Sequence, residues 1–349
     1  MNNCTKYCFS FAGLIASLLL VGCDSDSVTQ SDQSVLPLSD PNNEGGWILN
    51  TVVSDEFEEA DLDEDRWFIV GKFENGKPVY KDPDHPDREV WIGRAPAQFS
   101  GRNYRLEDGK LKLETRWEPD FPFSTEPGLD NVKYDYANIT TAAVINRKLF
   151  KYGYIEVLSK AADAEVSSAL WMTRHEYENG QRNNTELELD IYEHFGSHRI
   201  EGQEYRDREL WWTIHDWDPK FGHENGNNVT YTEKKDLGFR VADGFHTYGF
   251  EWTETGIRYF IDGKLFSEAS REDIEKWAKE EKGREKGYVI EKAMHLWLDS
   301  ESFPWRGYPD SKEDLERNSP EGEKDDGVVD YEIEYVRVWQ RSEHMEQSE

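Results

Sequence analysis

Short stretches in which apolar and polar residues alternate dominate the chain from about residue 46 onward. Each of the clearest ones lies next to a turn signal or a glycine, and they cover residues 110–115, 154–159, 257–261 and 329–338. A period of two is the pattern of a strand that is buried on one face. Many short strands separated by turns predict an all-β domain, built as a sandwich or as a barrel.

One helix is expected within this all-β pattern. Ser270 and Asp273 have the spacing of a capping box, apolar residues follow on one helical face, and Gly283 fits the position after the last turn. The long polar stretches at 117–135 and 301–327 predict loops, which often form the walls of a cleft in such sandwiches.

The N-terminus has the pattern of an export signal. Lys6 is the only charged side chain before Asp24, and the apolar run at 9–21 is too short to span a bilayer. The run ends in Leu-Val-Gly-Cys, which looks like a bacterial lipobox and predicts cleavage before Cys23 and attachment of lipid to that cysteine. An ordinary signal peptide with a chance cysteine is the alternative.

The chain is therefore expected to contain a lipoprotein signal peptide (1–22), a flexible tether (23–45) and one large domain (46–349). The tether is rich in Ser, Asp, Gln, Pro and Asn. The three cysteines are Cys4, Cys8 and Cys23, so the domain itself has neither a disulfide nor a cysteine metal site. The expected location is a bacterial membrane, at the cell surface or in the periplasm, with the lipid as the membrane contact.

Composition narrows the choice of partners. The net charge of -31 argues against nucleic acid as a partner. Aromatic residues make up 13% of the chain and include 13 Trp, whose rings can stack on sugars. Because acidic residues number 72, an acidic motif here needs support from its setting.

The most informative segment is an acidic strand pattern at 186–191. Its leucines and isoleucine alternate with Glu186, Glu188 and Asp190, which predicts one apolar face and one face lined by carboxylates. Like charges on one face repel, so solubility alone does not require this arrangement. Strict alternation puts Glu193 on the wrong face, and a one-residue bulge near Ile191 or Tyr192 would return it beside Asp190. A solvated acidic strand is the alternative.

Such a row of acids suits hydrolysis of a glycosidic bond with retention of configuration. That reaction needs a carboxylate nucleophile and a protonated carboxylic acid about 5–5.5 Å apart. Next-but-one residues on a strand are about 6.5–7 Å apart, within reach of side-chain adjustment. A third acid between them helps to keep the two in different protonation states.

The segment Glu188-Leu-Asp-Ile-Tyr-Glu193 resembles the active-site signature of glycoside hydrolase family sixteen in its bulged form. Further segments resemble that family in the same order along the chain, at 54–57, 151–157 with 169–171, 245–252 with 259–263, and 331–339. The resemblance implies a jelly-roll β-sandwich with an open substrate cleft on its concave sheet. It implies Glu188 as nucleophile, Glu193 as acid/base and Asp190 as their hydrogen-bonding helper, with 46–349 as the catalytic domain.

Two other segments are similar to the red-algal galactan branch of the family, which contains agarases and porphyranases. They lie at 91–94 and 298–307. Tryptophan stacks on sugars, arginine binds hydroxyls or sulfate, and a carboxylate accepts from hydroxyls. The candidate substrate-binding residues are Trp91, Arg94, Trp171, Arg174, His194, His215, Glu301, Trp305 and Arg306. The alternatives are core packing for each tryptophan, pairing with surface acids for Arg94 and Arg174, an ordinary loop acid for Glu301 and a structural role for each histidine.

The sequence thus predicts an endo-acting, retaining hydrolase of porphyran or agarose, acting as a monomer. A laminarinase-like β-glucanase and a carrageenase share the catalytic signature, and a carbohydrate-binding lipoprotein without activity shares the sandwich. No metal or cofactor is expected in catalysis. The family resemblance allows a structural calcium away from the acids, for which the sequence identifies no ligands.

Overall fold

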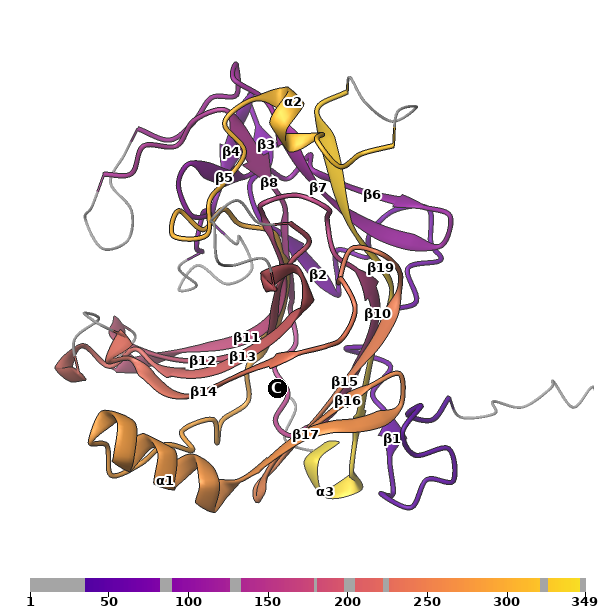
Figure 1. The fold of residues 1–349 in the computed structure, drawn as a ribbon, viewed down its shortest axis with the longest axis vertical. Coiled ribbons are helices and arrows are strands. Elements are labelled where there is room, and N and C mark those ends of the chain that lie inside the picture. Colours follow the sequence, from indigo (N-terminus) through magenta and orange to yellow (C-terminus); the bar gives the residue numbers. More distant parts are fainter. Residues whose placement is uncertain are drawn as a thin grey trace, which may run out of the picture. The chain divides into compact units, whose positions relative to one another are not determined.

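The computed structural model describes residues 35–81, 90–125, 133–178, 181–197, 205–221, 226–320 and 326–345, with side chains except at 175–178, 181–186 and 219. They belong to one compact unit, Ser34–Glu349. Two open sheets pack face to face in this unit (Figure 1). The all-β prediction is therefore confirmed, as a jelly-roll sandwich.

The larger sheet has ten strands, and all its pairings are antiparallel except that of β5 with β8. Its order is β17 (Lys264–Ser270), β16 (Gly256–Ile261), β15 (His246–Thr253), β10 (Gly153–Lys160), β19 (Val328–Gln340), β7 (Lys110–Trp117), β8 (Ile139–Thr141) and β5 (Ala97–Phe99), while β1 (Ile48–Leu49) pairs with β19 and β6 (Tyr104–Glu107) with β7. The four strands predicted from alternation all belong to this sheet, as β7, β10, β16 and β19.

The smaller sheet has seven strands and carries the acidic segment. Its order is β14 (Val229–Asp236), β13 (Glu209–Asp216), β12 (Gln181–Phe195), β11 (Ser167–Glu178), β18 (His295–Asp299), β9 (Ala143–Asn146) and β2 (Trp67–Ile69). A separate hairpin joins β3 (Lys72–Glu74) to β4 (Lys77–Val79). The described helices are α1 (Arg271–Lys282), α2 (Lys312–Leu315), α3 (Ser342–Met345) and the 3-10 turns η1 (Arg206–Arg208) and η2 (Pro219–Phe221).

The hydrophobic core fills the space between the two sheets. Alternate residues of facing strands supply it, among them Ile155 and Val157 of β10, Leu189 of β12 and Ile333 of β19, all fully buried. Each fully buried side chain of this size contributes about 1.5–3 kcal/mol. Since residues 35–349 contain no cysteine, this burial stabilises the domain without disulfides.

Helix α1 forms where the capping pattern predicted it. Ser270 accepts a hydrogen bond from the backbone of Asp273, whose side chain accepts one in return, and Gly283 adopts the left-handed conformation at φ 65°. Ile274 and Ala278 are buried, and the helix contacts β14, β16 and β17 (Figure 1). The helix therefore supports the end of the smaller sheet that carries β14.

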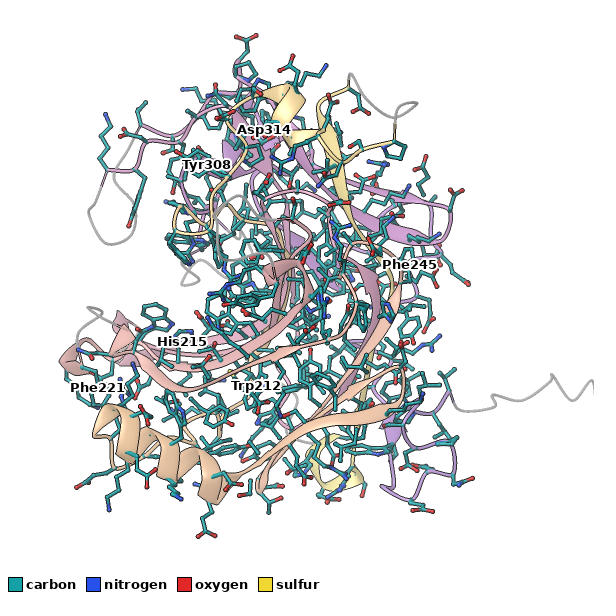
Figure 2. The ribbon with its side chains drawn as sticks, in the orientation of Figure 1. Trp212, His215, Phe221, Phe245, Tyr308 and Asp314 are labelled. Atoms are coloured by element: carbon teal, nitrogen blue, oxygen red, sulfur yellow. The ribbon has the colours of Figure 1, made fainter. Side chains whose placement is uncertain are left out.

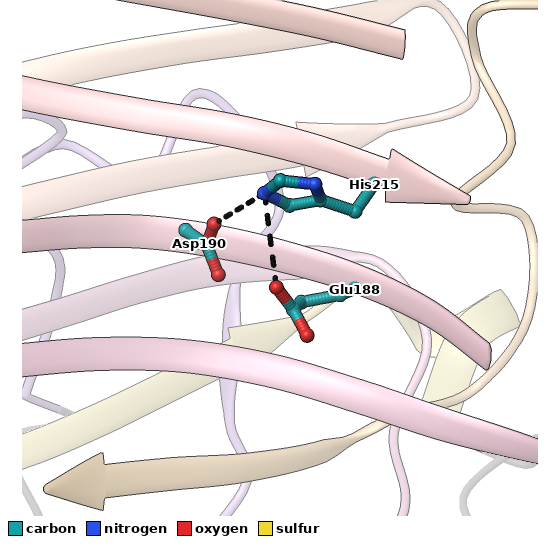
Figure 3. A group of neighbouring side chains, drawn as sticks. All are labelled: Glu188, Asp190 and His215. Carbon is teal, nitrogen blue, oxygen red and sulfur yellow. Dashed lines mark hydrogen bonds and ion pairs between the residues drawn. The ribbon is translucent and has the colours of Figure 1, made fainter. Parts of the chain in front are cut away.

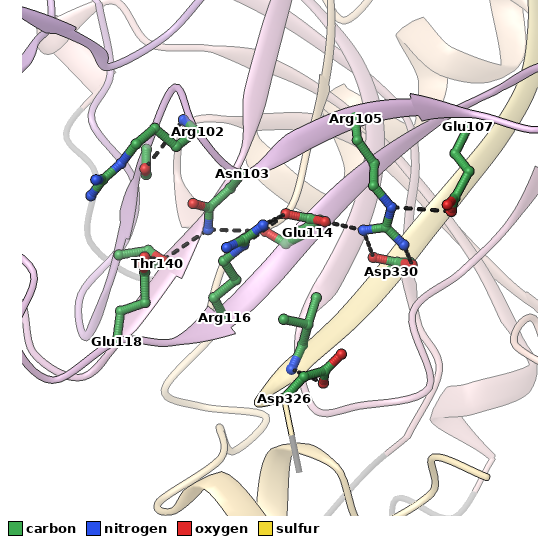
Figure 4. Close-up of polar contacts among 12 residues, drawn as sticks. Arg102, Asn103, Arg105, Glu107, Glu114, Arg116, Glu118, Thr140, Asp326 and Asp330 are labelled. Carbon is green, nitrogen blue, oxygen red and sulfur yellow. Dashed lines mark hydrogen bonds and ion pairs between the residues drawn. The ribbon is translucent and has the colours of Figure 1, made fainter. Parts of the chain in front are cut away.

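An ion-pair network ties β6, β7 and β19 together on the face of the larger sheet that points away from the core (Figure 4). The buried carboxylate of Glu114 lies between Arg105 and Arg116, and Arg105 Nη1 also lies 3.1 Å from Asp330 Oδ1. A buried carboxylate needs such partners, because desolvation of an unpaired charge is costly.

The N-terminal part of the described chain lies against the outside of the larger sheet. Trp339 donates its indole N–H to Val35 O at 2.7 Å, and the Leu38 amide donates to Glu156 at 2.9 Å. The expectation that the tether extends to residue 45 is therefore wrong for 35–45, which belong to the folded unit. The signal peptide and Cys23 lie outside the described residues. Within the described part of the chain, no helix has the length and hydrophobicity needed to cross a membrane.

Candidate active site

Strand β12 contains the predicted bulge. Asp190 pairs with Trp171 of β11, and the next pair joins Tyr192 to Leu170, so Ile191 is the extra residue. A single extra residue reverses the side on which the following side chains point. The bulge therefore changes which face of the sheet receives the end of β12.

The bulge brings the three acids to one face. Glu188, Asp190 and Glu193 lie opposite alternate residues of β11, which are Thr173, Trp171 and Ala169. Alternate residues of a strand share a face, so the three carboxylates point away from the core. We call this side of the seven-stranded sheet the catalytic face. Two residues of β13 mark the two faces of this sheet in Figure 2: His215 lies on the catalytic face, and Trp212 points into the core.

His215 connects two of the acids (Figure 3). Its Nε2 lies 3.1 Å from Asp190 Oδ2 and 3.7 Å from Glu188 Oε1. The amide nitrogen of Asn228 lies 2.7 Å from His215 Nδ1. Since an amide N–H₂ can only donate, Nδ1 accepts and Nε2 carries the proton that is donated to Asp190. The prediction that His215 lies at the site agrees with this position.

Trp217, which the sequence analysis did not single out, holds Glu188. Its indole N–H donates to Glu188 Oε2 at 3.0 Å, and its ring stacks on that of His215 with centroids 5.2 Å apart. A hydrogen bond to a carboxylate is charge-assisted and fixes the orientation of the acceptor. The strand pattern could not identify Trp217, because it follows the end of β13.

The acids differ in how strongly they hold a proton. Burial and, second to it, the charge of Asp190 together raise the pKa of Glu193 to about 8, although the charges of Arg94 and Arg306 oppose the rise. Burial also raises the pKa of Asp190, and the value remains at about 7 although a hydrogen bond with Glu188 opposes the rise. At neutral pH Glu193 is therefore protonated, as a general acid must be.

The segments at 91–94 and 301–305 meet beside these acids. Glu301 is 7% exposed and accepts from the indole N–H of Trp91, and Arg94 Nη2 lies 3.3 Å from its Oε2. The guanidinium of Arg94 also lies 4.8 Å from the ring of Phe303 and 5.2 Å from that of Trp305, which is 53% exposed. Trp305 thus offers an accessible ring, while Glu301 holds Trp91 and Arg94 in place.

Trp171 lies between this group and the acids. It stacks on Trp297 with ring centroids 4.5 Å apart and donates to Asp299 Oδ2 at 2.9 Å. Asp299 is buried, and burial together with the charge of Glu301 raises its pKa well above the usual range. It was missed as a site residue, although it lies within the quoted segment 298–307.

Two of the predicted substrate-binding residues do not lie on the catalytic face. His194 is 1% exposed and stacks on Tyr192 at 4.2 Å, with Tyr248 at 4.6 Å. The prediction that His194 faces the substrate is therefore wrong, because it follows Glu193 on the strand and points into the core. Alternation also puts Arg174 on the side of β11 opposite to Trp171, and its Nη1 lies 3.2 Å from Ala293 O.

Arg306 does reach the catalytic face. It is 6% exposed and packs against the rings of Phe195 at 4.4 Å and Trp211 at 4.3 Å. Its Nη2 lies 3.4 Å from Glu209 Oε1. The predicted residues Trp91, Arg94, Trp171, His215, Glu301, Trp305 and Arg306 are thus grouped around the acids or beside them.

One group among the described residues has donor spacing that could hold a cation. Ligand atoms of Glu188, Asp190 and His215 all lie within 4.8 Å of one another. Each already takes part in a hydrogen bond: Glu188 accepts from Trp217, Asp190 accepts from His215, and His215 accepts from Asn228. The donors thus satisfy one another, as expected for a catalytic hydrogen-bond network.

Comparison with known proteins identifies the class of this protein. Residues 47–341 match the family model "Beta-porphyranase A-D, GH16 domain". The chain therefore belongs to glycoside hydrolase family 16, and it is a polysaccharide-degrading glycosidase with the jelly-roll fold of that family.

Individual relatives include porphyranases. Beta-porphyranase B of Zobellia galactanivorans is 27% identical over 303 residues, which cover 84% of this chain and 85% of the relative. The crystal structure of porphyranase B from that organism matches with a TM-score of 0.59 and 26% identity over 84% of this chain and 92% of the other. The laminarinase catalytic domain of Thermotoga maritima shares the fold, with a TM-score of 0.55 and 22% identity over 84% of this chain and 98% of the other.

Proposed function

We propose that this protein is an endo-acting, retaining hydrolase of β-galactosidic linkages in a red-algal galactan, porphyran or agarose. The observation that carries the proposal is the bulged strand β12. It puts Glu188, which accepts from Trp217, on the same face as Glu193, whose pKa is raised to about 8. One ionised and one protonated carboxyl group are what a retaining glycosidase requires.

The reaction follows from these two states. Glu193 protonates the glycosidic oxygen while Glu188 attacks the anomeric carbon, which gives a covalent glycosyl-enzyme and a free leaving chain. Glu193, now ionised, removes a proton from water, and that water releases the sugar from Glu188 with its original anomeric configuration. Repulsion between Glu193 and Asp190 favours return of the proton to Glu193.

The choice of a galactan rests on relatives and on the surroundings of the acids. Five of the curated relatives are beta-porphyranases, at 25–27% identity. The aromatic rings of Trp91, Trp171 and Trp305 beside the acids are suited to stacking on sugars. Arg94 adds a cation next to these rings.

Three measurements test the proposal. Reducing-sugar release from purified agarose, porphyran, carrageenan and laminarin identifies the substrate, and the size distribution of early products distinguishes endo from exo action. Proton NMR of the first products should show the β anomer. An initial α anomer would contradict retention, and release from laminarin or carrageenan alone would replace the proposed substrate.

We also propose that Cys23 carries a lipid that holds the enzyme on a bacterial membrane. The supporting observation is the sequence Leu-Val-Gly-Cys at the end of the apolar run. When full-length protein is expressed in a bacterial host, wild type should fractionate with membranes and Cys23→Ala should not. An unchanged distribution would overturn this proposal and leave the enzymatic one intact.

A further inference from the structure

A small apolar cluster lies on the outside of the larger sheet. Tyr154 of β10 and Trp339 of β19 pair across the sheet, and they alternate with core residues of the same strands, so they point away from the core. Trp47 and Phe260 complete this outer cluster. The catalytic face is the outside of the smaller sheet, so the outer cluster lies on the opposite side of the sandwich (Figure 1).

The first described residues of the chain are fixed over the outer cluster. The hydroxyl of Ser39 donates to the hydroxyl of Tyr154 at 2.9 Å, next to the hydrogen bonds that join Val35 and Leu38 to the same sheet. A Cβ atom on Gly263, in the turn between β16 and β17, would lie 2.8 Å from Leu38 Cγ, so the leucine packs on that turn. The larger sheet therefore determines where the chain leaves the domain on its way to Cys23.

Exposed apolar side chains group at this exit point. Val35 is 40% exposed, and Leu38 and Leu265 are each 53% exposed. Leu265 pairs with Phe260, so it lies on the outer face beside the cluster. They are three of the eight large apolar side chains that the described part of the chain exposes, and such a grouping marks a surface of interaction. We call Val35, Leu38 and Leu265 the exit patch.

The chain between the exit patch and the proposed lipid is short on the scale of the domain. Val35 lies twelve residues after Cys23. A chain of that length reaches about 40 Å when it is fully extended and spans about 20 Å on average as a flexible coil. A compact domain of about 300 residues is about 50 Å across. A lipid on Cys23 therefore holds the exit patch close to the membrane, whereas the catalytic face reaches the bilayer only if the domain turns over.

We propose that the exit patch is a membrane contact surface, which rests on the lipid bilayer and directs the catalytic face away from it. The inference rests on the proposed lipid at Cys23 and goes beyond it, because an anchor alone fixes no orientation. Tethering makes the contact intramolecular, so a few apolar side chains are enough to favour one orientation of the domain. With the patch on the bilayer, a long polysaccharide approaches the catalytic face without crossing the lipid surface.

Photocrosslinking to lipid tests this orientation. Cys23 is the only cysteine from residue 23 onward, so the chain that begins there can be coupled through its thiol to maleimide-phosphatidylethanolamine in vesicles of phosphatidylethanolamine and phosphatidylglycerol. The photoreactive residue p-benzoylphenylalanine replaces Leu38, Leu265 or Tyr205, the last as a control that is 48% exposed and precedes β13 of the smaller sheet. Irradiation should give lipid adducts at positions 38 and 265 and none at 205. Equal adduct formation at all three positions would overturn the proposed orientation.

A substitution separates apolar contact from mere nearness to the tether. Leu38→Gln keeps a side chain of similar size and adds no charge beside Glu156, and it removes one apolar contact with the bilayer. It should reduce the yield of lipid adducts at position 265 severalfold, whereas Tyr205→Gln should leave that yield unchanged. An unchanged yield in Leu38→Gln would overturn the membrane contact. Adducts between two copies of the protein in place of lipid adducts would also overturn it, because a second copy would then cover the patch.

Chemical coupling also separates failure of this inference from failure of the proposed lipidation. The lipid is attached in vitro, so the adducts do not depend on whether a cell modifies Cys23. If Cys23→Ala leaves the distribution in cells unchanged while the coupled chain gives adducts at positions 38 and 265 alone, lipidation fails and the affinity of the exit patch for a bilayer stands. If Cys23→Ala releases the protein from membranes while all three positions crosslink alike, the membrane contact fails and lipidation stands.

Discussion

Replacement of Asp190 by asparagine should move the alkaline limit of activity to lower pH. Glu193 must be protonated to act as the acid, so the rate falls as the pH rises through its pKa, which is raised to about 8. The charge of Asp190 is, after burial, the largest cause of that rise. Without this charge, Glu193 loses its proton at a lower pH.

The size of the effect can be worked from the geometry of the strand. Two carboxylates about 5 Å apart repel by about 3 kcal/mol at an effective dielectric constant of about 20, which corresponds to about two pH units. Because the pKa of Asp190 is raised only to about 7, its carboxyl group is largely ionised where Glu193 titrates, near pH 8. We therefore expect the alkaline limb to move down by about one to two pH units.

The assay is the pH profile of kcat/KM between pH 5 and 10 on the polysaccharide that the wild type cleaves. Asp330→Asn is the control, because Asp330 pairs with Arg105 on the opposite sheet and should leave the limb in place. A limb that stays in place or moves to higher pH in Asp190→Asn would refute the assignment of Glu193 as the acid.

Three further outcomes are expected. Glu188→Gln and Glu193→Gln should each reduce kcat by several powers of ten with an unchanged circular dichroism spectrum, and near-native turnover of either variant would contradict its role. Trp217→Phe removes the donor to Glu188 and should reduce kcat about tenfold with a smaller change in KM, whereas an unchanged kcat would mean that this hydrogen bond is dispensable. Burial lowers the pKa of His194 from 6.5 to about 3, so His194 stays neutral in the folded protein while it gains a proton in the unfolded chain below pH 6.5. The free energy of unfolding is therefore unaffected by this residue above pH 6.5 and decreases as the pH falls from 6.5 toward 3. At pH 5 this loss is about 2 kcal/mol, and urea unfolding of His194→Phe should show a correspondingly smaller fall in stability between pH 7.5 and pH 5.

The sequence was sufficient for features that depend on local pattern. Alternation at 186–191 and the position of Glu193 together required a bulge, and the structure has it at Ile191. The capping signals at Ser270 and Gly283 likewise located α1. These predictions succeed because the period of a strand and the ends of a helix are set by neighbouring residues.

Features that depend on contacts between distant segments could not be predicted in the same way. The contact of Trp217 with Glu188 depends on the register between β12 and β13, which the sequence does not specify. Residues 35–45 have the composition of a linker, and hydrogen bonds to residues far along the chain hold them, namely Tyr154, Glu156, Trp339 and Arg341. The error on His194 was avoidable, because a residue next to Glu193 on a strand must point to the other face.

The location of both reacting carboxyl groups on β12 has a mechanical consequence. When a sheet twists or bends, the distances between its strands change more readily than the spacing along any one of them. Glu188 and Glu193 would therefore move together during such fluctuations and keep their separation, while Trp91, Arg94 and Trp305 shift relative to them. Variation of the surrounding segments can thus alter which sugar chain is accommodated while the reacting pair keeps its spacing. Deletion of the bulge residue Ile191 would restore strict alternation, so the pair would still share one face.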